Sequence, residues 1–386
     1  MVQGMDQFVA IVLDQRGRRL VQPIFAIWTF CLDHGRGSVS GMRKEIYRMA
    51  DAEALAVLAR SPVVHLATTD AEGGPILRTV HGVVVDGALA FHGAPAGEKI
   101  AALGRPVVAG AEETIAVIPS YFFDPTLACP ATTYYRSAQL HGVLEEVTDR
   151  HAKARVLAAL MAKYQPEGGH APIDADDPRY RKQVEGILVV QVGQARIDGK
   201  GKFGQNRKPE ELLSVLTQLW KRGLVGDPAA IEALRRGHPQ LPAPAFLRAP
   251  EGLRLCCAMG PNELAGALAL VGEQYWNLEV PRPVLARAHL GSSAWVGAHD
   301  ADGRLVATAR AAGDGGRFVY ILDVAVAPDW QGRGLGSAVM QLLLDHPAVR
   351  DARVIRLRTR DRPGFYARLG FVPQPATSSH DMQRGP

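Results

Sequence analysis

The sequence predicts two domains of different fold class, a mostly-β N-terminal domain with peripheral helices and a C-terminal α/β domain. Between Val63 and Val147, short β-branched and apolar runs alternate with turns rich in Gly, Pro and Asp, which is typical of an antiparallel sheet. From Tyr320 to Met340 the chain reads as a strand, a glycine-rich turn and an amphipathic helix start, which is typical of an α/β domain. Residues 223–251, rich in Pro and Ala, separate these patterns, and 386 residues are enough for two or three domains.

Residues 1–41 fit neither domain, and we expect them to be an appendage without chemistry, either disordered or added upstream of the native start. Their apolar runs, 8–13 and 25–32, are separated by Gln15-Arg-Gly-Arg-Arg19, and no small-residue cleavage site follows. A secretory signal is therefore not expected. Met42 begins a run that resembles a natural start.

The first domain is predicted over residues 42–222 as a closed or nearly closed sheet. Its expected strands cover 63–69, 76–84, 89–93, 107–112, 133–147 and 187–197, because these runs are rich in β-branched and aromatic residues and are bounded by turn signals. Peripheral helices are expected at 98–103, 151–164 and 209–222.

A semi-stiff linker is predicted over residues 223–251, with a short helix at 229–236 and few contacts across it. The second domain is predicted over 252–375, followed by a frayed tail, 376–386. It should begin with a strand at 254–259 and a helix at 263–276. A hairpin, 294–298 with 305–310, then turns at Asp302-Gly303. Strands at 320–326 and 354–358 should flank the helix that follows the glycine-rich turn.

Composition narrows the class of protein. Hydrophobic residues make up 47% and charged residues 22% of the chain, as in soluble globular proteins, and no apolar run is long enough to span a membrane. The four cysteines show neither metal-ligand spacing nor a disulfide framework, so a cytoplasmic location and no metal site are expected. The net charge of +5 comes from scattered Arg residues, so neither nucleic acid nor membrane is an expected partner.

The glycine-rich turn Gln331-x-x-Gly334-x-Gly336 has the properties of a pyrophosphate cradle. A backbone without Cβ atoms can approach a phosphate closely, and the free N–H groups of a first helical turn point at it. The strand before the turn ends at Pro328, and the motif lacks the Lys-Ser/Thr pair of a nucleoside-triphosphate loop.

These residues resemble the coenzyme A motif of the GNAT acetyltransferase superfamily, Gln/Arg-x-x-Gly-x-Gly/Ala after a strand ending in Val-x-Pro. Gly364-Phe-Tyr-Ala-Arg-Leu-Gly-Phe371 is similar to the family's Phe-Tyr-x-x-x-Gly-Phe. The resemblance covers roughly residues 252–375 and implies a GNAT acyltransferase fold. It also implies acetyl-CoA as co-substrate and a small amine as acceptor. The coenzyme-binding residues that it implies are Val324, Ala325, Val326, Gln331, Gly332, Arg333, Gly334, Leu335, Gly336 and Ser337.

The resemblance assigns Tyr366 as the acid that protonates the departing thiolate. Asp323 alternates with Val324 along the strand and is a candidate general base, directly or through water. The alternative roles are non-catalytic: Tyr366 as a core aromatic residue, and Asp323 as a solvated or structural carboxylate. The acceptor amine is not specified, although the loop near Tyr275-Trp-Asn-Leu278 offers apolar and aromatic surface.

The first domain resembles the FMN-binding split barrels related to pyridoxamine 5'-phosphate oxidase, in the branch with nitroimidazole-resistance and flavin-nucleotide-binding proteins. Three motifs carry the resemblance: Leu66-Ala-Thr-x-Asp-x-x-Gly-x-Pro75, His92-Gly-Ala-x-x-Gly-x-Lys99 and Tyr135-Arg-Ser137. The implied FMN-binding residues are Arg78, Thr79, Val80, His92, Gly93, Lys99, Ser137, Lys202, Gln205 and Asn206. Glu98 departs from relatives with two adjacent basic residues, which should weaken the grip on a phosphate.

Arg78 could instead be a solvated strand residue, and His92 a hydrogen-bonded core histidine. Because split barrels bind flavin between subunits, the resemblance also implies a homodimer. Two functions follow. The first is an acetyl-CoA-dependent N-acetyltransferase joined to an FMN-binding module of oxidoreductase type. The alternative is a sensor that binds flavin and acyl-CoA without turnover.

Overall fold

The computed structural model describes residues 9–13, 19–23, 45–70, 72–96, 98–193 and 196–373, in two compact units, 1–45 and 46–386. In the first unit, β1 (Val9–Leu13) pairs antiparallel with β2 (Arg19–Pro23). This hairpin lies in the segment predicted to be disordered. The remainder of 1–41, and the tail 376–386, lie outside the described residues.

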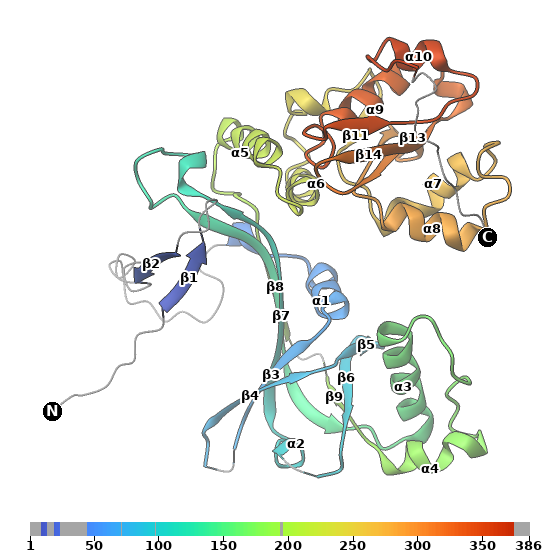
Figure 1. The fold of residues 1–386 in the computed structure, drawn as a ribbon. Coiled ribbons are helices and arrows are strands. Elements are labelled where there is room, and N and C mark those ends of the chain that lie inside the picture. The colour runs from blue at the N-terminus through green and yellow to red at the C-terminus, as the bar shows by residue number, and fades with distance from the viewer. Residues whose placement is uncertain are drawn as a thin grey trace. The chain divides into compact units, whose positions relative to one another are not determined.

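The second unit begins with an eight-stranded antiparallel sheet (Figure 1). Its strands are β3 (Val64–Thr69), β4 (Pro75–Val80), β5 (Val83–Val85), β6 (Ala88–Gly93), β7 (Pro106–Ile118), β8 (Thr132–Glu146), β9 (Leu188–Val192) and β10 (Arg196–Lys202). The strand order is β4-β3-β7-β8-β9-β6-β5, and β10 also pairs with β8. The outermost strands β4 and β5 are separated only by His81 and Gly82, so the chain itself joins the two edges and the sheet curls into the predicted split barrel.

Helix α1 (Asp51–Arg60) buries Leu58 against the barrel strands, whose inward side chains include Leu66, Phe91 and Leu140. Helix α2 (Glu98–Ala101) lies between β6 and β7. Helix α3 (Arg150–Tyr164) fastens the corner between β4 and β5, because Lys163 Nζ donates to the Gly82 carbonyl at 2.7 Å and the Tyr164 hydroxyl donates to it at 3.2 Å.

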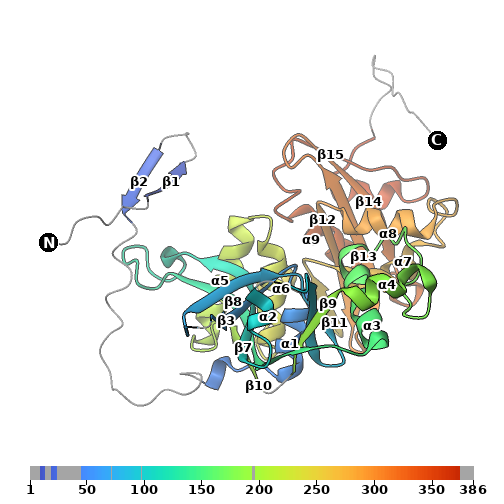
Figure 2. The same ribbon diagram turned by 90° about the horizontal axis from the view of Figure 1, so that it is seen from below.

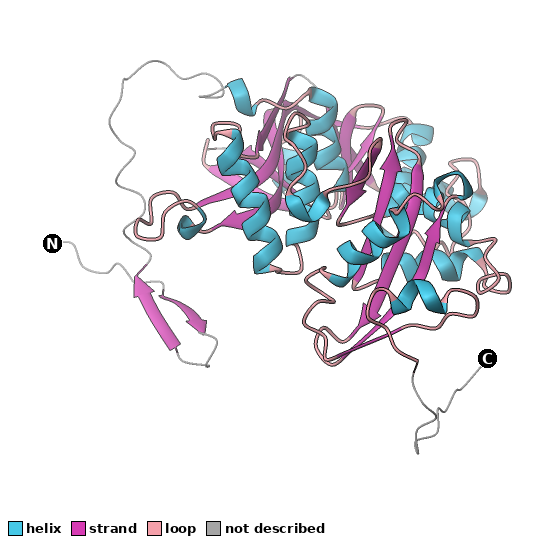
Figure 3. Ribbon diagram, turned by 90° about the horizontal axis from the view of Figure 1, so that it is seen from above, coloured by secondary structure: helices cyan, strands magenta, loops and turns pink. Residues whose placement is uncertain are grey.

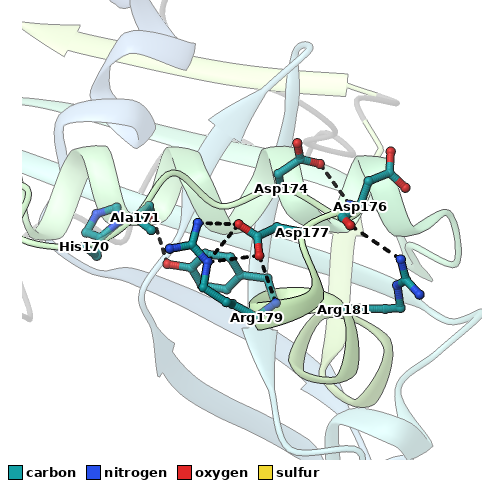
Figure 4. A network of polar contacts seen from close by, with 8 residues as sticks. His170, Ala171, Asp174, Asp176, Asp177, Arg179 and Arg181 are labelled. Carbon is teal, nitrogen blue, oxygen red and sulfur yellow. Dashed lines mark hydrogen bonds and ion pairs between the residues drawn. The ribbon is translucent and has the colours of Figure 1, made fainter.

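Polar contacts order the loop between α3 and α4 (Pro178–Gly186), as Figure 4 shows. Asp177 caps α4 by accepting from the Arg179 backbone N–H at 2.8 Å, and it also pairs with the Arg179 guanidinium. The Asp176 backbone N–H donates to Asp174 at 2.9 Å. These carboxylates are therefore engaged in building the loop.

Residues 209–247 form a packed helical connector; the helix predicted at 209–222 is present, but the predicted linker 223–251 has extensive contacts instead of few. Helix α5 (Pro209–Arg222) and helix α6 (Asp227–Gly237) precede the short 3-10 turn η4 (Ala245–Leu247). Both helices have a buried apolar face, and one core cluster contains residues of the barrel, of the connector and of the C-terminal sheet. Trp220 stacks on Phe246 at 4.5 Å and donates from Nε1 to Asp345 at 2.6 Å.

The C-terminal domain is a five-stranded sheet with helices on both faces (Figure 3). Its strands in order are β11 (Leu253–Cys256), β12 (Ala294–Asp300), β13 (Leu305–Gly313), β14 (Phe318–Val326) and β15 (Val354–Arg356). Its helices are α7 (Leu264–Val271), α8 (Arg282–Leu290), α9 (Leu335–Leu344) and α10 (Pro363–Ala367), with η5 (Pro261–Glu263) before α7 and η6 (Pro328–Trp330) before α9. The predicted α/β fold is confirmed, although the helix expected at 263–276 ends at Val271 and α8 was not predicted.

Alternate residues of β12 face different helices. Trp295 packs in a cluster with Ala267 of α7, whereas Val296 packs in the cluster that contains Leu335 and Val339 of α9. Strand β15 is parallel to β14 and lies beside it (Figure 2). It pairs with β14 only from Phe318 to Tyr320, so β14 continues to Val326 without this neighbour.

Candidate functional site: a cavity at the splayed strands

A β-bulge marks β14 where β15 no longer pairs with it. On β13, Arg310 is paired with Leu322 and Thr308 with Ala325, so the single residue between them opposes both Asp323 and Val324. Asp323 has φ 50°, in the left-handed region that few residues other than glycine adopt. The bulge therefore changes the direction of the β14 backbone beside the unpaired side of the strand.

A cavity of 690 Å³ opens at this position. It brings together most of the residues predicted to bind coenzyme A, together with both predicted catalytic residues: Val324, Ala325, Val326, Gln331, Gly332, Gly334, Gly336, Ser337, Asp323 and Tyr366. Two predicted residues lie elsewhere. Leu335 is 1% exposed and packs in the core, and Arg333 lies over the Trp330 ring at 5.0 Å and lines a separate hollow with Asp329.

The turn before α9 has the geometry of an anion cradle. Gly332 and Gly334 have φ 76° and 80°, and a Cβ added to either would meet no atom within 4 Å, so their open sides are not filled by protein. The first intrahelical bond of α9 runs from Ala338 N to Gly334 O, which leaves the preceding N–H groups of the first turn without intrahelical acceptors. Gln331 Nε2 donates to the Val326 carbonyl at 3.0 Å and ties the turn to the strand. Such a terminus suits a phosphate.

Tyr366 lies on α10 and also lines the cavity. Its ring meets Phe365 and Phe371 edge-on, at 5.0 and 6.1 Å between centroids. Burial raises the pKa of Tyr366, with Asp361 adding to the effect. The phenol therefore stays protonated at neutral pH, as a proton donor must.

Asp323 is buried, and both of its carboxylate oxygens are occupied. Oδ2 accepts from Arg310 Nε at 2.6 Å, and Oδ1 accepts from Trp276 Nε1 at 3.0 Å and from Asn277 Nδ2 at 2.9 Å. Burial alone would raise the pKa of Asp323, but the Arg310 charge and these hydrogen bonds hold it below its usual value. A weakly basic carboxylate with occupied oxygens does not favour the predicted role of general base.

The other end of the cavity is formed by Tyr275 and Trp276, each 38% exposed, and by the loop after β15. The Tyr275 hydroxyl donates to Asp361 at 3.5 Å, and the Arg360 guanidinium lies 3.8 Å from the centre of the Tyr275 ring. Reasoning from the sequence singled out the Tyr275–Leu278 loop but missed Asp361 and Arg310. A lone Arg in an apolar strand, with a lone Asp in the next strand, was the available signal for Arg310.

In the barrel, the predicted flavin residues lie on separate strands. Arg78, Thr79 and Val80 are consecutive on β4; Arg78 and Thr79 are exposed, whereas Val80 is 6% exposed and belongs to the core. The Thr79 hydroxyl lies 3.5 Å from His65 Nδ1 on β3. His92 and Gly93 end β6, and Ser137 of β8 is opposite Glu112. The Lys99 side chain lies outside the described residues.

The turn after β10 uses part of its predicted ligand set internally. Gln205 accepts from the Phe203 backbone N–H and donates to the Gly201 carbonyl, both at 2.7 Å. Lys202 donates to the Thr132 hydroxyl, and burial lowers its pKa. Asn206 is exposed. Gln205 thus shapes the turn, which leaves Lys202 and Asn206 as the polar side chains that could reach a ligand.

Within the described ranges, no group of three or more His, Cys, Asp or Glu side chains is placed to hold a metal ion. Across the same part of the chain, no helix combines the length and the apolar character that crossing a membrane would require.

Two family models match the chain. Residues 50–201 match the model described as "Pyridoxamine 5'-phosphate oxidase", and residues 291–373 match the one described as "Acetyltransferase (GNAT) domain". These two matches cover the barrel and most of the C-terminal domain, respectively. The chain combines a split barrel related to pyridoxamine 5'-phosphate oxidase with a domain of the GNAT acetyltransferase superfamily, which confirms the two resemblances in the sequence.

Curated relatives with N-acetyltransferase names are similar to part of the chain. "GCN5-related N-acetyltransferase 1, chloroplastic" of Arabidopsis thaliana is 36% identical over 129 residues, which cover 33% of this chain and 61% of that protein. "Serotonin N-acetyltransferase 2, chloroplastic" of Oryza sativa subsp. japonica is 46% identical over 74 residues, 19% of this chain and 37% of that protein. The chain thus spans less than two thirds of either relative. Among solved structures, an FAD and heme binding protein from Mycobacterium smegmatis is similar, with TM-score 0.35, 20% identity and coverage of 44% of this chain and 79% of that one.

Proposed function

We propose that the C-terminal domain transfers an acetyl group from acetyl-CoA to a small amine. The observation that carries this proposal is the single cavity lined by the glycine cradle of α9, the unpaired stretch of β14 and Tyr366. Arg358, Arg362 and Arg368 also line the cavity, and their positive charge suits a coenzyme with several phosphate groups.

The chemistry follows from this placement. The amine nitrogen attacks the thioester carbonyl carbon, a C–N bond forms, and the C–S bond breaks. Backbone N–H groups near Val324 polarise the carbonyl and stabilise the negative charge that develops on its oxygen. Tyr366 donates its proton to the departing thiolate, and the proton that the amine nitrogen loses returns through solvent to the tyrosinate, so the products are a neutral amide and free coenzyme A thiol. The amine enters from the side of Tyr275 and Trp276, where an aromatic or aliphatic body could pack on the exposed rings. The name of the rice relative makes an arylalkylamine the first acceptor to try.

Two measurements test the proposal. Calorimetry should detect acetyl-CoA binding to the full chain, and release of free coenzyme A thiol should identify acceptors. Tyr366→Phe keeps the ring packing, so acetyl-CoA binding should survive while the acetylation rate falls by about 10²-fold or more. Absence of acetyl-CoA binding by the wild-type chain would refute the acetyltransferase proposal, and an unchanged rate in Tyr366→Phe would remove that residue from the mechanism.

We also propose that the barrel binds FMN in a homodimer, because it matches a flavoprotein family and presents an exposed Arg78 on β4. The residues that would hold FMN are Arg78, Thr79, Lys202 and Asn206; Val80 and Gln205 contribute packing and turn geometry instead. When bound, FMN would supply the electron-transfer chemistry of an oxidoreductase. The three described cysteines are unpaired, which fits a reducing compartment such as the cytoplasm.

An absorption spectrum after reconstitution with FMN and gel filtration tests the second proposal. A stoichiometric flavin spectrum in a dimer-sized peak supports it, and Arg78→Gln should weaken FMN binding by about tenfold or more through loss of a charge-assisted contact. A colourless peak would refute it. If the acetyltransferase reaction also failed while acetyl-CoA still bound, the non-catalytic sensor would remain as the better description.

A further inference from the structure

The polar network around Asp323 connects three elements that meet at the cavity. Arg310 comes from β13, Asp323 from β14, and Trp276 and Asn277 from the loop between α7 and α8. The Arg310–Asp323 ion pair is buried, with side-chain exposures of 10% and 4%. Asn277 is 7% exposed and also donates to the Val271 carbonyl at 3.1 Å, at the end of α7. The carboxylate is therefore the common acceptor of donors from both the sheet and the loop.

The backbone of Asp323 has an unfavourable conformation that these contacts hold in place. Few non-glycine residues adopt φ 50°, although Asn and Asp tolerate it best. The register shift beside Arg310 shows that the bulge is centred at this residue. Because Arg310 of the neighbouring strand β13 pairs with the Asp323 side chain, the ion pair stabilises the bulge as well as the loop.

Other charged and titratable groups face this network from α8. Arg310 Nη1 lies 3.4 Å from the Ala288 carbonyl, and the adjacent His289 is 1% exposed. Burial lowers the pKa of His289, and its Nε2 has no hydrogen-bond partner among the described residues. His289 is thus neutral at pH 7, and the Asp323 charge is balanced by Arg310.

We propose that Asp323 is a positioning residue that couples the acceptor loop to the coenzyme-binding bulge of β14. This inference rests on the proposed acetyltransferase function. Trp276 and Asn277 line the acceptor end of the cavity, whereas Val324–Val326 line the coenzyme end, and the Asp323 carboxylate is the link between them. A change in the loop contact therefore alters the backbone that receives the thioester. Acetyl-CoA and acceptor bind cooperatively through this link.

Asp323→Asn tests the role of the charge, because Asn tolerates the left-handed backbone while it abolishes the ion pair. We expect the acetyl-CoA dissociation constant and the acceptor KM each to rise by about tenfold, with the acidic limb of the pH–rate profile unchanged. A general base would give the opposite pattern, with unchanged affinities and loss of that limb. The second pattern would overturn the proposal.

Trp276→Phe tests the coupling, because it removes one N–H donor to Asp323 and keeps an aromatic ring in the loop. It should weaken acetyl-CoA binding as well as acceptor binding. Trp295→Phe is the matched control for the loss of an indole N–H: Trp295 Nε1 donates to Thr308 at 2.9 Å and not to Asp323, and Trp295 does not line the cavity. This control should leave acetyl-CoA affinity unchanged.

Circular dichroism and thermal melting of all three variants test whether they fold. If Trp276→Phe is folded and binds acetyl-CoA as tightly as the wild type, the coupling is refuted. Failure of the wild-type chain to bind acetyl-CoA would instead refute the proposed function itself, so the two failures are distinguishable.

Discussion

Replacing Gly334 by Ala probes the cradle where coenzyme binding is expected to depend on the absence of a side chain. Gly334 is the N-cap of α9, with φ 80° and ψ −5°, and its missing Cβ would point into space that no protein atom occupies within 4 Å. An L-residue in this conformation costs about 1–2 kcal/mol. The new methyl group also extends from the turn where a phosphate would approach the free N–H groups of the helix.

The neighbouring substitution Gly336→Ala is the control. Gly336 is a helical residue without positive φ, and its Cβ would lie 3.6 Å from Phe365 and from Val326, which is ordinary contact. Alanine in a helix is more stable than glycine by about 0.5–1 kcal/mol, and the GNAT motif accepts Ala at this position. The two variants add the same methyl group two residues apart, but with opposite expected effects on stability.

Urea unfolding and calorimetry with acetyl-CoA measure the two effects. Gly334→Ala should lower the free energy of unfolding by about 1–2 kcal/mol and weaken acetyl-CoA binding by roughly 10- to 100-fold, the scale of a lost charge-assisted contact. Gly336→Ala should retain affinity and gain stability. Wild-type affinity in Gly334→Ala would refute the assignment of this turn as the cradle.

Two further predictions concern stability. Burial lowers the pKa of His346 to about 4. Between about pH 6.5 and pH 4 the unfolded chain therefore binds a proton at this histidine that the folded chain does not bind. The free energy of unfolding, measured by urea titration, should fall by roughly 3 kcal/mol over this pH range. His346→Asn, whose amide oxygen could still accept from Ala348 N, should flatten that dependence, and an unchanged slope would show that other groups cause it. A fragment 252–375 should melt at a lower temperature than 207–375, because it lacks the connector helices that share its core, and equal melting would restore the simple linker.

The helices of the connector were predictable, but their packing into a shared core was not. Pro228 lies in the first turn of α6, where a missing N–H costs nothing. Helix α6 has few apolar residues, and its sequence alone does not show which elements they pack against. Strands with strong β-branched composition and the glycine turn were predictable, because both signals are local.

The site also contains residues that local sequence predicts and residues that depend on tertiary structure. Residues within one turn or strand, such as Gln331 and Gly334, were identified from their spacing, and they do line the cavity. The bulge at Asp323 was not predictable, because a bulge is defined by register against the neighbouring strand. Alternation along β14 left Asp323 as either a candidate base or a solvated or structural carboxylate, and the three donors around it favour a structural carboxylate.

The connector also contacts both domains directly. The Phe203 carbonyl, in the turn shaped by Gln205, lies 2.9 Å from His238 Nε2 at the end of α6. Two turns earlier in α6, Glu232 accepts from the backbone N–H of Cys257, which directly follows β11, at 2.8 Å. Glu232 is 2% exposed and forms an ion pair with Arg235 at 3.0 Å. Breaking a buried ion pair typically costs about 3–5 kcal/mol. Helix α6 therefore contacts both the barrel turn that carries Lys202 and Asn206 and the residue that follows the first strand of the C-terminal sheet.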